Sequence, residues 1–162
     1  MPIQNIDQPE ILMIDAALRL RKFDGEFDFA FRWYQDPETV WLVDGVRKPY
    51  SLETLSNMYH YLDRQGELYF IEVLEEGWKP IGDVCFWQED MPIVIGDPAY
   101  RRRGIGCKVI AALIGRGREL GYSRLKVNEI YEYNSGSRKC FENAGFRLLE
   151  PTEKGNRFYI DL

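Results

Sequence analysis

Runs of hydrophobic residues broken by short polar turns predict several β-strands in this chain. The predicted strands cover residues 11–23, 67–74, 81–88, 91–96 and 125–133, with one or two more within 147–162. Turn residues at Glu76-Gly77 and Glu89-Asp90 separate the second, third and fourth of these strands. Because such short connections join antiparallel neighbours, the three strands are expected to form an antiparallel meander.

Three segments have the features of helices. The first is expected between Ser51, a good N-cap residue, and Gly66, with hydrophobic residues at helical spacing between them. The second is expected over about 104–120 and the third, which is shorter, over about 135–144. This order of strands and helices predicts a single α+β domain over residues 1–162, built on a mostly antiparallel sheet.

Composition narrows the class of protein. The chain has 162 residues, of which 45% are hydrophobic and 29% are charged, so it can bury a core. No apolar run reaches the roughly 18 residues that a membrane-spanning helix needs. The N-terminal stretch MPIQNIDQPEILMID has no basic head followed by an apolar segment, so no signal peptide is expected. A cytoplasmic protein without a membrane partner is therefore predicted.

The cysteines and the single histidine bear on redox and metal chemistry. Cys85, Cys107 and Cys140 are odd in number and far apart, which argues against a disulfide framework, and His60 is the only histidine, which argues against a metal site. Cys85 and Cys140 have apolar neighbours and are expected to be buried as small hydrophobic residues. Cys107 follows three arginines at a helix N-terminus, where positive charge would make its thiol reactive.

Charge is unevenly distributed along the chain. The net charge of −5 is made up of −11 over residues 1–100, +7 over 101–126 and −1 over 127–162. A basic block within an acidic chain predicts one place for an anion and another for a cation. The acidic remainder would repel a long polyanion, so a compact phosphorylated cofactor is favoured and a nucleic-acid partner is not.

The basic block contains a loop suited to phosphate. Arg101-Arg102-Arg103-Gly104-Ile105-Gly106 joins a predicted strand to the second helix. The glycines allow backbone N–H groups to converge, the helix N-terminus adds partial positive charge, and arginines supply forked donors, so the loop is a candidate pyrophosphate cradle. The alternative is a basic loop that only caps the helix. The chain has no P-loop motif, and Val109 stands where a dinucleotide fingerprint requires glycine or alanine.

Two motifs in order resemble the GNAT N-acetyltransferase superfamily. Arg101-x-x-Gly104-x-Gly106 resembles its acetyl-CoA loop, and Asn134-x-x-Ser137-x-x-x-Phe141-x-x-x-Gly145-Phe146 resembles its second motif. The stretches Ile95-Gly96-Asp97-Pro98-x-Tyr100-Arg101 and Trp33-x-x-Asp36-Pro37-Glu38 are similar to the branch of ribosomal-protein N-terminal and aminoglycoside 6′-N-acetyltransferases. The resemblance implies a mostly antiparallel mixed sheet of about six to seven strands flanked by about four helices.

The resemblance also implies a cofactor site for acetyl-CoA. The backbone of Val94, Ile95 and Gly96 would pair with the pantetheine arm. Backbone amides from Arg102 through Arg103, Gly104 and Ile105 to Gly106 would hold the pyrophosphate, with Arg101 adding charge. Asn134 would bond the pantetheine arm, and the following helix, with Ser137 and Phe141, would lie along it.

For the chemistry, a base has to deprotonate the acceptor amine, because a primary amine has a pKa of about 10.4. The resemblance makes Asp90 the candidate, with Glu89 and Glu129 in reserve; the alternative for Asp90 is a turn residue. The family's usual proton donor is a tyrosine where this chain has Phe141. Tyr131 or Tyr133 acting through a water is one substitute, and tyrosines simply packed on a strand are the alternative.

Acceptor recognition is expected in the acidic and aromatic segment from Asp24 to Trp41. Its acids and aromatic rings suit a cationic amine; the alternative is a solvated acidic loop over core aromatics. The leading hypothesis is an acetyl-CoA-dependent N-acetyltransferase that moves the acetyl group directly, in a ternary complex, to a primary amine of a small molecule or a peptide N-terminus. The alternative is a non-catalytic acyl-CoA-binding sensor or interaction module. The resemblance also implies a possible homodimer.

Overall fold

The computed structural model describes residues 5–162, so the first four residues of the N-terminal stretch discussed above lie outside it. The strands are β1 Ile11–Asp15, β2 Leu18–Lys22, β3 Glu67–Leu74, β4 Trp78–Phe86, β5 Ile93–Ile95, β6 Arg124–Tyr131, β7 Arg147–Pro151 and β8 Gly155–Asp161. The helices are α1 Pro37–Asp44, α2 Leu52–Gln65, α3 Ile105–Glu119 and α4 Ser135–Asn143, with 3-10 helices η1 Asp28–Gln35 and η2 Pro98–Tyr100. The predicted α+β class is confirmed.

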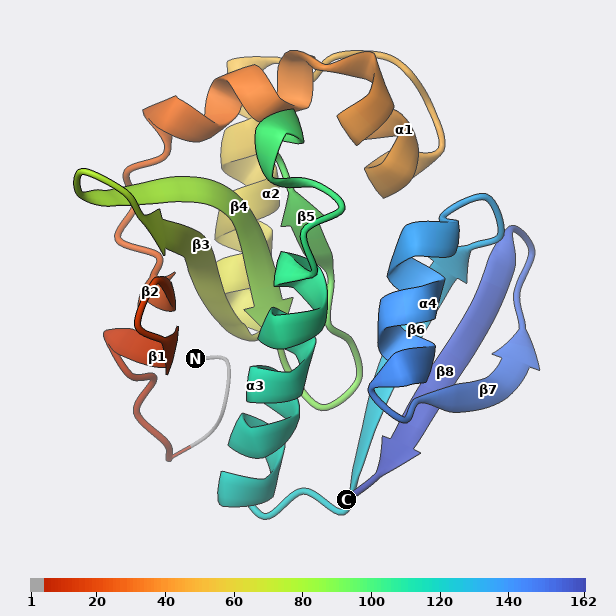
Figure 1. Ribbon diagram of the computed structural model, residues 1–162. Coiled ribbons are helices and arrows are strands. Elements are labelled where there is room, and N and C mark those ends of the chain that lie inside the picture. The colour runs from red at the N-terminus through yellow and green to blue at the C-terminus, as the bar shows by residue number, and fades with distance from the viewer. Residues whose placement is uncertain (1–4) are drawn as a thin grey trace.

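The strands form two antiparallel sheets. One has the order β1-β2-β3-β4-β5 and the other β6-β8-β7. Helix α3 lies on one face of the larger sheet and α2 on the other, while α4 covers the smaller sheet (Figure 1). The expected meander is confirmed as β3-β4-β5, since β4 pairs with both β3 and β5 in antiparallel register. Strand β5 is an edge strand of the larger sheet and β6 is an edge strand of the smaller one. The two strands are not paired, and the gap between them separates the sheets.

Two N-terminal elements differ from the prediction. Residues 11–23, predicted as one strand, form the hairpin β1-β2, because the N–H of Ala17 bonds to Oδ1 of Asp15 and closes a turn. Helix α1 was not predicted, although Asp36-Pro37 signals it: the Asp36 side chain accepts the N–H of Glu38, and proline occupies the first helical position.

The core has one cluster on each face of the larger sheet. On the α3 side, Val109 and Leu113 pack with Tyr69 and Ile71 of β3. On the α2 side, the buried residues are Phe23, Ala30, Trp33, Tyr34, Leu55, Tyr59, Leu68, Phe70 and Cys85. Strand β3 is mostly apolar on both faces because both are covered, and its two buried glutamates, Glu67 and Glu72, are paired with arginines. No helix within residues 5–162 is long and apolar enough to cross a membrane.

Candidate active site

The outer edge of β5 exposes main-chain groups. The N–H of Gly96 donates to Ile81 O at 2.8 Å, and the N–H of Cys85 donates to Pro92 O at 3.0 Å. In an antiparallel ladder these bonds alternate, so the main chain of Val94 also faces β4, whereas that of Ile95 faces the open edge. Of the three residues expected to pair with pantetheine, Ile95 is therefore the one whose main chain is presented to the gap.

The loop before α3 has a group of N–H donors without partners. Within residues 5–162, none of the N–H groups from Arg102 to Cys107 donates a hydrogen bond. Arg102 has φ +61° and Gly104 has φ +76°, both left-handed, and an added Cβ at Gly104 would meet nothing within 4 Å. Left-handed residues next to a helix N-terminus turn successive amides toward one anion. This geometry fits the pyrophosphate of coenzyme A.

The three arginines of the loop have different surroundings. Arg101 turns inward: its Nε donates to Ile95 O at 3.0 Å, one terminal nitrogen donates to Oγ1 of Thr39 at 2.6 Å, and the other lies 3.7 Å from Oδ2 of Asp36. Arg103 lies over the Tyr100 ring at 5.1 Å, and Arg102 and Arg103 are exposed. Arg101 thus ties α1 to β5, and the side-chain charge available to an anion comes from Arg102 and Arg103.

This difference gives a test. Arg101→Ala is expected to destabilise the fold by about 2 kcal/mol, because it removes hydrogen bonds of a charged group to two elements. Arg103→Glu is expected to leave the midpoint of urea unfolding nearly unchanged and to weaken coenzyme A binding about tenfold. Unfolding curves and calorimetric titrations of both variants measure the two effects. Equal losses of affinity with unchanged stability would contradict the assignment of Arg101.

Helix α4 follows the end of β6. Oδ1 of Asn134 accepts the N–H of Ser137 at 3.2 Å, so Asn134 caps α4 and keeps its amide NH2 for another partner. Phe141 is only 1% exposed and its ring lies edge-on to that of Phe146. The expectation that Phe141 lines the cofactor is therefore corrected: it is a core residue, because the smaller sheet needs an apolar cover.

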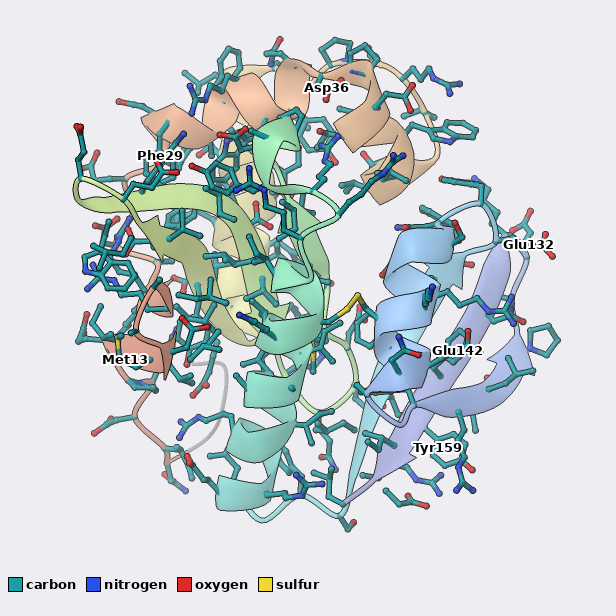
Figure 2. All side chains as sticks on the ribbon, viewed as in Figure 1. Met13, Phe29, Asp36, Glu132, Glu142 and Tyr159 are labelled. Atoms are coloured by element: carbon teal, nitrogen blue, oxygen red, sulfur yellow. A yellow bond between two sulfur atoms is a disulfide. The ribbon has the colours of Figure 1, made fainter. Side chains whose placement is uncertain are left out.

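The structure also corrects the expectation for two cysteines. Cys107 in the first turn of α3 and Cys140 in α4 form a disulfide, with their Cα atoms 4.9 Å apart (the yellow bond in Figure 2). Cys107 is thus no free reactive thiol, and Cys140 is no buried apolar filler. The sequence did not indicate this pair, because the two cysteines are 33 residues apart and come together only when α3 and α4 pack. Cys85 is free and buried, as expected.

Asp90 lies where the two sheets meet. Its Oδ1 accepts the N–H of Met91 at 2.9 Å and the N–H of Asn128 at 3.0 Å, which joins the turn before β5 to β6. Burial raises the pKa of Asp90 above its ordinary value, and the two amide bonds act in the opposite direction. This geometry gives the carboxylate a structural task, and its role as a base stays a prediction.

An aromatic stack connects α1 with the end of β6. The rings of Trp41 and Tyr133 lie 4.5 Å apart, those of Tyr133 and Tyr131 lie 5.3 Å apart, and Oη of Tyr133 donates to Trp41 O at 2.7 Å. A groove of about 530 Å³ is lined by Trp41, Gly45, Glu132, Tyr133 and Lys154. Burial, followed by the charges of Glu129 and Asp44, raises the pKa of Tyr131.

The predicted acceptor segment divides into two parts. In its first part Trp33 and Tyr34 are buried, whereas Asp24, Glu26 and Asp28 are exposed, which matches a solvated acidic loop over core aromatics. Only the later part, with Trp41, reaches the groove described above. The acidic and aromatic composition of the segment therefore reflects mainly core packing and solvation.

A carboxylate that the sequence analysis did not select lies beneath this region. Asp83 of β4 is 3% exposed, and its Oδ2 accepts the hydroxyls of Tyr34 and Tyr59, both at 2.8 Å. Burial raises the pKa of Asp83 to about 6, although the two phenol hydrogen bonds favour the charged form. One signal was present in the sequence: Asp83 is the only charged residue in the apolar stretch 81–86.

Comparison with known proteins places this geometry in a family. The family model described as the acetyltransferase (GNAT) family matches residues 27–146. A comparison with curated protein sequences gave no match.

Solved structures share the fold. An acetyltransferase of the GNAT family from Bacillus anthracis has a TM-score of 0.78 at 15% identity, with 93% of this chain and 98% of that chain covered. The ribosomal L7/L12 α-N-protein acetyltransferase RimL, in complex with coenzyme A, has a TM-score of 0.72 at 16% identity, covering 94% and 98%. Spermidine N-acetyltransferase from Vibrio cholerae, in complex with CoA and spermine, has a TM-score of 0.69 at 19% identity, covering 91% and 96%. Because the family model spans most of the sequence, the chain belongs to the GNAT family of acetyltransferases, enzymes that use acetyl-CoA.

Proposed function

We propose that this protein transfers the acetyl group of acetyl-CoA to a primary amine by direct attack in a ternary complex. The observation that carries the proposal is the set of unpartnered N–H groups from Arg102 to Cys107, next to the open edge of β5. A phosphorylated ligand held by that loop would reach the gap between the two sheets. The thioester supplies an acyl group with a good leaving group.

Residues of this chain would orient acetyl-CoA, the acetyl donor, and polarise its thioester. The amides of the loop and the side chains of Arg102 and Arg103 would hold the pyrophosphate. The Ile95 N–H faces the gap and can donate to the thioester oxygen, where negative charge develops during attack. The amide NH2 of Asn134 is free of its capping bond and would bind the pantetheine arm.

The proton donor to the leaving sulfur is proposed to be Tyr131. Phe141 has no hydroxyl and is buried, so it takes no part. Tyr131 ends β6 and is partly exposed beside the groove at Trp41 and Tyr133. Because the leaving thiol has a pKa of about 8.5, protonation of its sulfur helps the reaction without being required. A phenol acting through one water is sufficient for that help.

The acceptor is proposed to be a cationic primary amine, of a small molecule or a peptide N-terminus. Glu132 in the groove attracts an ammonium group through its charge, and the rings of Trp41 and Tyr133 supply apolar contact for a carbon chain; Lys154 lines the same groove. The resemblance in fold to spermidine N-acetyltransferase, solved with spermine, supports a cationic amine as the class to test first.

The proposal is tested by free thiol release from acetyl-CoA with polyamines, aminoglycosides and short peptides as acceptors. At least one acceptor is expected to raise thiol release well above the rate without acceptor, with matching acetylated product by mass spectrometry. Calorimetry with coenzyme A is the companion measurement. Saturable binding together with no acetylation of any amine would favour the acyl-CoA sensor, whose specific support is the replacement of the usual tyrosine by Phe141.

A further inference from the structure

Asp83 is a buried carboxyl group without a compensating cation. Within residues 5–162, no lysine or arginine pairs with it, and the titratable groups around it are the phenols of Tyr34 on η1, Tyr59 on α2 and Tyr50, with the thiol of Cys85 on its own strand. All of these are neutral at pH 7. A buried carboxylate without a cation is costly, and a cationic ligand beside it would offset that cost.

Only one oxygen of this carboxylate is used by the protein. Oδ2 accepts both phenols, whereas Oδ1 accepts no hydrogen bond from the described residues. Among polar side-chain atoms sealed from solvent in residues 5–162, only Nε1 of Trp33 lacks a partner. Oδ1 is therefore not fully sealed from solvent.

The position of Asp83 on β4 places that oxygen near the proposed acetyl-CoA site. Asp83 pairs directly with Val94 of β5, so both side chains lie on the face that η1 and α2 cover. Adjacent strands lie about 4.8 Å apart, so the carboxylate is one strand from the open edge at Ile95. Asp90, the base candidate of the sequence analysis, precedes β5 and so lies at the end of that strand away from Ile95. One of its carboxylate oxygens already accepts two backbone amides.

We infer that Asp83 is the general base: Oδ1 binds the ammonium group of the acceptor and takes its proton. This inference rests on the proposed function and adds to it the residue that receives the amine. Tyr34 and Tyr59 are positioning residues, since their hydroxyls hold Oδ2 and leave Oδ1 without a hydrogen bond from the described residues.

The proton transfers balance as follows. One N–H bond of the ammonium breaks and the proton passes to Oδ1. The freed lone pair forms the C–N bond at the thioester carbonyl carbon, and the C–S bond breaks with its electrons on sulfur. Tyr131 gives its proton to that sulfur through a water, which yields free coenzyme A, and the second proton of the former ammonium restores the Tyr131 hydroxyl. The proton on Asp83 leaves to solvent.

The test is the pH dependence of kcat/KM with the best acceptor of the amine panel. The wild type is expected to lose activity as the pH falls through about 6, where Asp83 becomes protonated. Asp83→Asn is expected to lower kcat/KM at pH 7 about 100-fold and to regain activity as the pH approaches the pKa of the amine. Affinity for coenzyme A and the unfolding midpoint are measured alongside, because Asn can still accept both phenols.

A second variant keeps the inference falsifiable where Asp83→Asn fails to fold. Tyr59→Phe removes one hydrogen bond to the charged carboxylate, so the acidic limb of the profile is expected to move to higher pH. Tyr61→Phe, an exposed tyrosine on the same helix, is the matched control and should leave the limb in place. If Asp83 had only a structural role, Tyr59→Phe would leave the acidic limb of the pH profile at the same pH.

The possible outcomes distinguish a failure of the proposed function from a failure of the role assigned to Asp83. A wild type that binds coenzyme A and acetylates no amine overturns the proposed function and, with it, the role of Asp83. An active wild type overturns the inference alone if Asp83→Asn keeps the wild-type profile, if Tyr59→Phe leaves the limb in place, or if Asp90→Asn abolishes the limb and Asp83→Asn does not.

Discussion

Gly104→Val is expected to weaken coenzyme A binding about 100-fold or more while the protein still folds. Gly104 has φ +76°, which a β-branched residue adopts only under strain, so the loop should relax and its amides should turn away from a common anion. Losing two bonds to a charged ligand, at about 1.5 to 3 kcal/mol each, gives that factor. Calorimetric titration with coenzyme A measures it.

The matched control lies at the other end of the same helix. Gly121 has φ +81° and, like Gly104, would place an added Cβ where nothing lies within 4 Å. Gly121→Val imposes the same backbone strain far from the loop, so it should lower stability by a similar amount and leave the affinity unchanged. If both variants bound coenzyme A as the wild type does, the loop would not be the pyrophosphate site.

Reduction of the Cys107–Cys140 disulfide is expected to lower the melting temperature by about 10 °C. The bond spans 33 residues, and the chain-entropy model assigns a loop of this size about 3 to 4 kcal/mol. For a domain of this length each kcal/mol corresponds to roughly 2–4 °C. Thermal unfolding with and without dithiothreitol measures the difference.

The double variant Cys107→Ser, Cys140→Ser is the control for that measurement. It should melt near the temperature of the reduced wild type and should not respond to dithiothreitol, since Cys85 is buried and unpaired. Identical melting of oxidised and reduced wild type would show that the bond adds nothing to stability. Because Cys107 belongs to the first turn of α3, the bond also ties the phosphate loop to α4.

Two interactions show how the N-terminal segment supports the site from a distance. Arg101 reaches Thr39 of α1 across 62 residues, and Tyr34 of η1 reaches Asp83 across 49. Both tie the segment between β2 and α2 to the strands beside the gap. Thr39 and Tyr34 of this segment therefore support the strands beside the gap. The composition of the segment had left two interpretations open, acceptor binding and a solvated acidic loop over core aromatics.

Local chemistry in the sequence was sufficient for most of the elements after residue 50 and for the candidate phosphate loop. The helix ends at Ser51, Gly104 and Gly121, the meander β3-β4-β5 and the order of the two motifs all depend on residues within a few positions of one another. Capping bonds, left-handed glycines and hydrophobic periodicity act over that range, so the sequence carries them openly.

Only the tertiary structure decided which side chains meet. The pairing of Cys107 with Cys140, the inward turn of Arg101, the burial of Phe141 and the two phenols on Asp83 all join or enclose residues through packing. Such contacts form when separate elements dock, and their energy depends on burial and distance, which a linear pattern does not contain. For this reason the sequence by itself pointed to the anion site and the family, whereas the hydrogen bonds that set Asp83 apart from the other carboxylates depend on the fold.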